Sequence, residues 1–114
     1  MTRKFVMTEA FDNAWKSMGL TDQDLARLQD MLLKDPKVGA VMQETGGLRK
    51  MRFPFEGRGK SGSARVTYVD FVVHEVIYLI FAYPKSEKDN LTKAERNAMK
   101  KVIAAIEAGL GGAK

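Results

Sequence analysis

The stretch Thr45–Tyr68, TGGLRKMRFPFEGRGKSGSARVTY, determines how the rest of the chain is organised. From Arg49 to Arg65 it carries six basic residues and one acidic residue, Glu56. Its net charge of +5 equals that of the whole chain of 114 residues, in which 19 basic residues stand against 14 acidic ones. All the uncompensated positive charge therefore lies in this basic segment, and nucleic acid is the commonest polyanion that such a charge would attract.

Side chains alternate along the first half of the basic segment. Met51, Phe53 and Phe55 would point to one side of a β-strand, while Lys50 and Arg52 would point to the other. The pattern predicts a strand with one face in the core and one cationic face.

Glycines interleave with the next basic residues, Arg58 and Lys60, and predict a loop. A second strand is expected over Ser63–Val72, with Arg65 near its start. The continuous apolar run Val76–Tyr83 predicts a third strand covered on both faces. Two hairpin connections in series predict an antiparallel meander.

Two helices are expected before the basic segment, after a short opening strand. The first follows Thr8, a good N-cap, and ends near Gly19. The second begins at a capping box formed by Thr21 and Asp24 and stops before Pro36. Together they predict a helical hairpin.

The remaining parts of the chain predict a turn and a final helix. Val38–Glu44 is ambiguous and is interpreted as a helical turn. Thr92 and Glu95 form another candidate capping box, and the helix that follows is expected to end near Gly109 with a frayed tail. The order β-α-α-β-β-β-α predicts an α+β fold over residues 1–114, a single compact domain with helices packed on a twisted antiparallel sheet.

Composition excludes several classes of protein. The chain has no cysteine, which excludes disulfides, thiolate metal sites and thiol nucleophiles. The longest apolar run, Val76–Tyr83, is far shorter than the roughly 20 residues that span a bilayer. The N-terminal residues contain charges and no secretory apolar core. We therefore expect a soluble, cytoplasmic protein with no membrane partner.

Acid–base residues are scarce near the basic segment. The one histidine, His74, is expected in a hairpin turn, and Glu56 and Asp70 are isolated carboxylates. No metal and no cofactor are therefore expected, because metal-dependent nucleases need clustered carboxylates. Cationic stabilisation of a reacting phosphate remains, and RNA suits it because the 2′-hydroxyl is a built-in nucleophile.

The candidate site is a cationic surface on which the basic residues of the sheet and its loops converge. Whether they converge depends on strand register, which the sequence does not specify. Tyrosines near the strands could stack on a base. The basic candidates are Lys50, Arg52, Arg58, Lys60, Arg65, Lys85 and Lys88, and the tyrosines are Tyr68, Tyr78 and Tyr83.

Three segments, GGLRKMRF (46–53), GRGKSGSARVTY (57–68) and YLIFAYPKSE (78–87), resemble the RelE/HigB superfamily of bacterial type II toxins, and specifically its HigB-like branch. The resemblance covers nearly the whole chain and implies a RelE-like fold. It also implies a ribosome-dependent mRNA interferase, a metal-independent endoribonuclease that cleaves translated mRNA in the A site. The implied reaction is in-line attack of a 2′-hydroxyl, which leaves a cyclic phosphate and a 5′-hydroxyl.

The resemblance assigns roles residue by residue. Ser86 stands where RelE has a further arginine, and Leu91 lies near its C-terminal stacking tyrosine, so Lys60, Lys88 and Tyr83 are alternatives for those roles. The implied catalytic set is Lys50, Arg52, Arg65, Lys85 and Tyr83, and the implied RNA-binding set is Arg49, Arg58, Lys60, Tyr68 and Lys88.

The resemblance also implies partners. These are a helix-turn-helix antitoxin of the HigA type, which would bring operator DNA only indirectly, and a ribosome with its mRNA and rRNA. Two other functions stay open. One is a ParE-like toxin that binds DNA gyrase without cutting RNA, and the other is a basic RNA-binding domain without catalysis.

Overall fold

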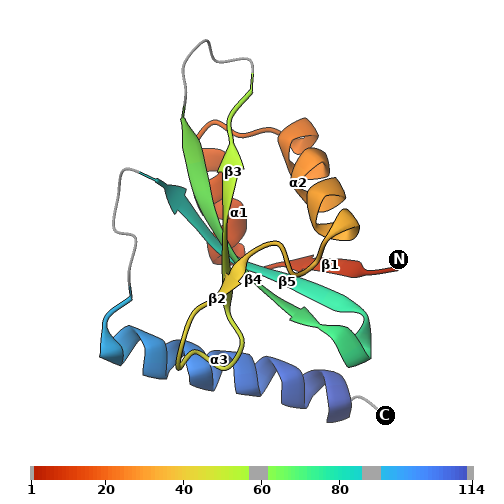
Figure 1. Ribbon diagram of the computed structural model, residues 1–114, viewed down its shortest axis with the longest axis vertical. Coiled ribbons are helices and arrows are strands. Elements are labelled where there is room, and N and C mark those ends of the chain that lie inside the picture. The colour runs from red at the N-terminus through yellow and green to blue at the C-terminus, as the bar shows by residue number, and fades with distance from the viewer. Residues whose placement is uncertain (1, 57–61, 86–90, 113–114) are drawn as a thin grey trace.

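A five-stranded sheet forms the centre of the computed structural model, which describes residues 2–56, 62–85 and 91–112 (Figure 1). Its spatial order is β1-β5-β4-β3-β2. All neighbouring strands are antiparallel except β1 and β5, which are parallel. The strands are β1 (Lys4–Met7), β2 (Ala40–Val41), β3 (Arg49–Pro54), β4 (Ser63–Phe71) and β5 (Val76–Pro84).

The α+β class and the β3-β4-β5 meander are confirmed. The sheet is not wholly antiparallel, because β1 joins the outer edge of β5 in the same direction after a long crossover through the intervening elements. Residues 38–44 form no helical turn. They contain β2 instead, which pairs Ala40 with Lys50 and Val41 with Arg49 at the far edge of the sheet.

Three α-helices begin where the capping residues predict. They are α1 (Glu9–Ser17), α2 (Asp22–Lys34) and α3 (Lys93–Gly112). Thr8 Oγ1 accepts a hydrogen bond from the backbone of Phe11, and Thr21 and Asp24 form the complete capping box. Helix α3 continues to Gly112, three residues beyond the end expected at Gly109.

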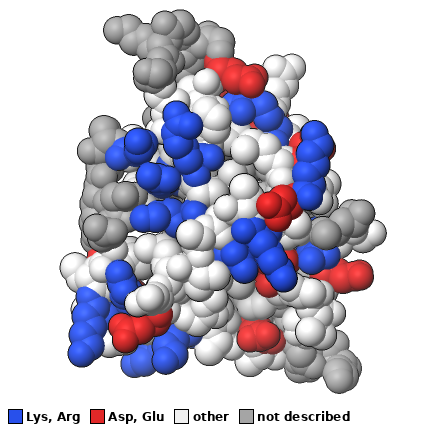
Figure 2. Space-filling model, in the orientation of Figure 1, with Lys and Arg blue, Asp and Glu red and all other residues white. Residues whose placement is uncertain are grey.

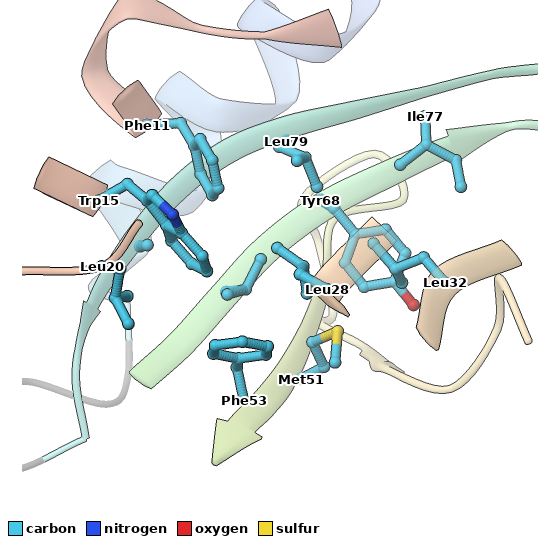
Figure 3. Close-up of a cluster of buried hydrophobic side chains, with 12 residues drawn as sticks. Phe11, Trp15, Leu20, Leu28, Leu32, Met51, Phe53, Tyr68, Ile77 and Leu79 are labelled. Carbon is cyan, nitrogen blue, oxygen red and sulfur yellow. The ribbon is translucent and has the colours of Figure 1, made fainter. Parts of the chain in front are cut away.

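Helices α1 and α2 pack on one face of the sheet and create the main core (Figure 3). Phe11 and Trp15 of α1 pack on this face, and their rings stack with centroids 5.2 Å apart. The side chains that fill the core are buried, which makes this face the principal source of hydrophobic stabilisation. They include Leu28, Leu32, Met51, Phe53, Val66, Tyr68, Ile77 and Leu79.

Helix α3 packs on the opposite face of the sheet and covers only part of it (Figure 1). Ile103 of α3 is buried against Val69, Phe71 and Ile80, which form a second, smaller core with Leu48. Val102, which the apolar pattern would include in the buried stripe, is 46% exposed. The part of this face near the start of β4 and the end of β5 lies beyond this second core.

A β-bulge in β5 separates the covered part of this face from the remainder. Thr67 pairs with Phe81 while the next residue, Tyr68, pairs with Leu79, so Ile80 is an extra residue in β5. The alternation of β5 changes phase there. Ile80 and Phe81 consequently face the same side of the sheet, Ile80 in the second core and Phe81 beyond it.

Candidate nucleic-acid interface

Two rows of side chains cross the part of the sheet beyond the second core. In the first row, Arg52 of β3 pairs with Arg65 of β4, and Arg65 pairs with Tyr83 of β5. Side chains directly opposite one another on adjacent antiparallel strands lie roughly 5 Å apart at Cβ. The register therefore brings together three of the five residues predicted to be catalytic.

The second row lies beside the first. Lys50 pairs with Thr67, and Thr67 pairs with Phe81, which is 42% exposed. The rings of Phe81 and Tyr83 stack with centroids 6.3 Å apart and an interplanar angle of 26°. We call Lys50, Arg52 and Arg65, with the two aromatic rings, the cationic face.

Ser63, at the start of β4, links two of the basic residues. Its Oγ accepts a hydrogen bond from Nε of Arg52 at 3.3 Å, and its carbonyl accepts one from the backbone N–H of Lys85 at 3.1 Å. The Lys85 side chain is exposed just past the end of β5. Lys85 is therefore held at the border of the cationic face, next to the start of β4.

Figure 2 shows blue basic side chains gathered over this part of the sheet. Glu56, the one acid of the basic segment, is turned to the other side and approaches Arg27 of α2 at 3.5 Å. Arg27 lies over the ring of Phe53, 4.1 Å from its centroid, and donates to the carbonyl of Pro54 at 2.7 Å. The acid of the segment thus pairs on the α2 side of the sheet and leaves the cationic face positive.

Arg49 does not join the cationic face. It has the same parity as Met51, so its side chain leaves the strand on the side of the main core. Its Nη1 donates to the carbonyl of Gly39 at 2.7 Å and to that of Lys37 at 3.4 Å. Arg49 therefore lies on the side of the sheet away from Lys50 and fastens the segment before β2 to the sheet, and RNA contact by Arg49 stays a prediction.

Tyr68 is a core residue, and its predicted contact with RNA is wrong. Its side chain is 0% exposed, and its hydroxyl accepts from the Gly39 N–H at 2.9 Å and donates to the Pro36 carbonyl at 2.8 Å. Burial raises the pKa of the Tyr68 phenol, and the Gly39 hydrogen bond and the charge of Arg49 oppose the rise. A ring enclosed in this way cannot stack on a base.

Three other predicted residues, Arg58, Lys60 and Lys88, lie outside the described residues. His74 lies in the 3-10 turn η1 (Val72–His74), at the end of the β4–β5 hairpin away from Arg65. Within the described ranges, no three histidine, aspartate or glutamate side chains come together as a metal site. Nor does any helix in these ranges have the length and apolar character needed to cross a membrane.

The sequence patterns did not identify Phe81, Thr67 or Ser63 as residues of the candidate site. Phe81 belongs to an apolar run that predicts burial, and the bulge at Ile80 that exposes it has no signal in the sequence. Ser63 and Thr67 are found only through register, which places them beside Arg52 and Lys50.

The fold defines a small α+β protein with three helices on a five-stranded mixed sheet and a cationic face. Residues 3–112 match the family described as the RelE toxin of the RelE / RelB toxin-antitoxin system, and the chain belongs to this family. It is therefore a toxin of a toxin-antitoxin system. Toxins of this family pair with an antitoxin and are generally endoribonucleases.

Proposed function

We propose that this toxin is a ribosome-dependent endoribonuclease of the HigB-like branch that cleaves translated mRNA in the A site without a metal ion. The observation that carries the proposal is the row in which Arg52, Arg65 and Tyr83 are direct cross-strand neighbours. Two guanidinium groups on one row suit a phosphate, because each presents several donors in a fixed planar fork.

In the proposed reaction, the 2′-oxygen of one nucleotide attacks the adjacent phosphorus, and the bond from phosphorus to the 5′-oxygen of the next nucleotide breaks. Arg65 and Arg52 bind the non-bridging oxygens and stabilise the charge that develops on them. One proton leaves the 2′-hydroxyl and one is delivered to the departing 5′-oxygen. The products are a 2′,3′-cyclic phosphate and a 5′-hydroxyl.

Lys50 and Lys85 are the proposed groups for these proton transfers. Arginine keeps its proton in proteins, whereas lysine can release and regain one. Lys50 lies one row from Arg52 on the same face of β3, and Lys85 is placed near the other end of the first row by the Ser63 carbonyl. Tyr83 would pack against the nucleotide at the reacting phosphate.

The proposed partners follow from the same assignment. The ribosome would present mRNA and rRNA to the cationic face, which places the protein in the cytoplasm. A helix-turn-helix antitoxin of the HigA type would neutralise the toxin, and operator DNA would be contacted only through that antitoxin.

Arg65→Ala tests the proposal in an assay with purified ribosomes and a defined mRNA. We expect codon-restricted cuts from the wild type and a loss of cleavage of about 100-fold or more in the variant, as for other groups that stabilise transition-state charge. Lys34→Ala is the matched control, because this lysine of α2 is 78% exposed and lies on the other side of the sheet. Circular dichroism checks that both variants are folded.

Intact mRNA with the wild-type protein would overturn the nuclease. If gyrase supercoiling fell while mRNA stayed intact, the protein would be a ParE-like toxin. Salt-sensitive RNA affinity without cleavage or growth arrest would instead define a binding domain.

A further inference from the structure

A groove of about 520 Å³ runs between α1 and the last residues of β5. It exists because β1 pairs with β5 only as far as Leu79. The chain then leaves the sheet at Thr8, whose Oγ1 donates to the Ile80 carbonyl at 2.6 Å, and α1 begins. Residues Phe81–Pro84 therefore lie beside α1 and the groove, in the position where a longer β1 would have paired with them.

The groove shares two residues with the cationic face. Phe81 and Tyr83 line it from β5, and Asn13 and Ser17 contribute polar side chains from α1. Among the described residues that line the groove, none has a charged side chain. Across the strand register, the neighbour of Tyr83 is Arg65. Within one cross-strand step, the described surface thus changes from positive side chains to an aromatic-edged groove lined by uncharged ones.

This division of charge matches the two parts of a nucleotide. A phosphate is held by guanidinium groups, whereas a base is neutral, flat and stacks on aromatic rings. The apolar ring of Phe81 is 42% exposed. Its neighbours across the sheet are Thr67 and then Lys50, so its own row does not lead into an apolar core. The volume of the groove falls within the range of small-molecule sites, so one base fits.

We propose that this groove is a base-binding subsite in which Phe81 stacks on an unstacked base of single-stranded RNA next to the reacting phosphate. Asn13, whose side-chain amide both donates and accepts, is the residue placed to discriminate among base edges. The subsite rests on the proposed function for the phosphate it neighbours. Phe81 is a positioning residue here, because it holds the base and takes no part in proton transfer.

Binding of an RNA that cannot be cleaved separates this subsite from the nuclease reaction. The probe is a short fluorescent 2′-O-methyl oligouridine, compared with the same backbone carrying abasic residues. Phe81→Leu should weaken binding of the oligouridine by about 5- to 100-fold, the range for losing one base–aromatic stack. It should leave binding of the abasic strand unchanged, and Phe81→Tyr should restore binding of the oligouridine.

Val73→Ala is the matched control, since this residue is 88% exposed in the turn at the other end of the β4–β5 hairpin. Asn13→Ala should change the ranking of oligouridine, oligoadenosine and oligocytidine without changing the affinity for the abasic strand. A melting curve for each variant excludes loss of folding as the cause.

The possible outcomes distinguish the two proposals. Weaker binding by Phe81→Leu together with no cleavage on ribosomes would overturn the nuclease and keep the subsite. Equal oligouridine binding by wild type and Phe81→Leu, or no RNA affinity in the wild type, would overturn the subsite. If Phe81→Leu weakened only the complex with the antitoxin, the groove would be a protein-docking site and the RNA proposal would be wrong.

Discussion

Arg52 of β3 lies directly across from Arg65 of β4, so two positive side chains occupy one cross-strand position. Like charges in this arrangement destabilise a sheet. Ser63 fixes the orientation of Arg52 by accepting from its Nε. The pair therefore concentrates positive charge where we place the reacting phosphate.

Arg52→Gln is expected to reduce RNA cleavage at little cost in stability. Relief of the repulsion between two opposed charges is worth about 0.2–1 kcal/mol, and it offsets the loss of the hydrogen bond from Nε to Ser63 Oγ. Arg49→Gln is the matched variant on the same strand, and it should lose about 1 kcal/mol because the guanidinium hydrogen bond to the Gly39 carbonyl disappears. Urea unfolding and ribosome assays measure both effects, and a stability loss in Arg52→Gln as large as that in Arg49→Gln would contradict the repulsion.

Tyr68→Phe should lower stability and leave RNA cleavage unchanged. The substitution removes a buried hydroxyl and leaves the Gly39 N–H and the Pro36 carbonyl without their partner, at a cost of about 1–3 kcal/mol. Cleavage is measured at a temperature where the variant remains folded. A loss of cleavage at that temperature would show that Tyr68 takes part in the RNA site.

The same tyrosine predicts a decline in stability at alkaline pH. Below about pH 10, the Tyr68 phenol is neutral in the folded and unfolded states. Above that pH the unfolded chain releases the proton, whereas burial raises the pKa of the folded phenol, so stability falls as pH rises toward the folded pKa. Melting temperatures from about pH 9 to about pH 11 should fall less steeply in Tyr68→Phe than in the wild type.

Gly39→Ala should destabilise the protein and disturb the cationic face. A Cβ at this position would lie 2.9 Å from Cε1 of Tyr68 and 3.0 Å from the carbonyl oxygen of Lys50. The backbone of β3 or the segment before β2 must move, at a cost of about 1–3 kcal/mol. Gly109→Ala, in open space on α3, should instead stabilise by up to about 1 kcal/mol. Thermal melts compare the two variants, and equal effects would be inconsistent with the close contact.

Asp70→Asn should cost much more stability than Asp30→Asn. The Asp70 carboxylate accepts hydrogen bonds from Nε and Nη2 of Arg3 at 2.8 and 3.3 Å. Both side chains of the pair are less than a tenth exposed. Breaking such a buried pair costs about 3 kcal/mol. Asp30 pairs with Lys34 on the surface of α2, where a contribution of about 0.5 kcal/mol is usual. Urea unfolding measures both, and similar values would show that solvent screens the Arg3–Asp70 pair.

Sequence alternation and capping were sufficient to predict the three α-helices, the strands of the meander and the two faces of β3, but not β2. Parity alone could also have separated Arg49 from Lys50. The parallel partner of β5 and the position of Arg65 opposite Arg52 depend on tertiary register, which local patterns do not contain. Tyr68 shows the same limit, because a tyrosine near basic residues looks accessible until its hydroxyl partners, Pro36 and Gly39, are known.

The extra residue in β5 sets the direction of the two aromatic side chains. Before Ile80 the odd-numbered residues face α1 and α2, and after it the even-numbered residues do. In a strand of the same length without the bulge, Phe81 and Tyr83 would point toward the main core and small Ala82 would take the outer position. The bulge therefore lets one strand place Ile80 in the second core and still present both rings on the cationic face.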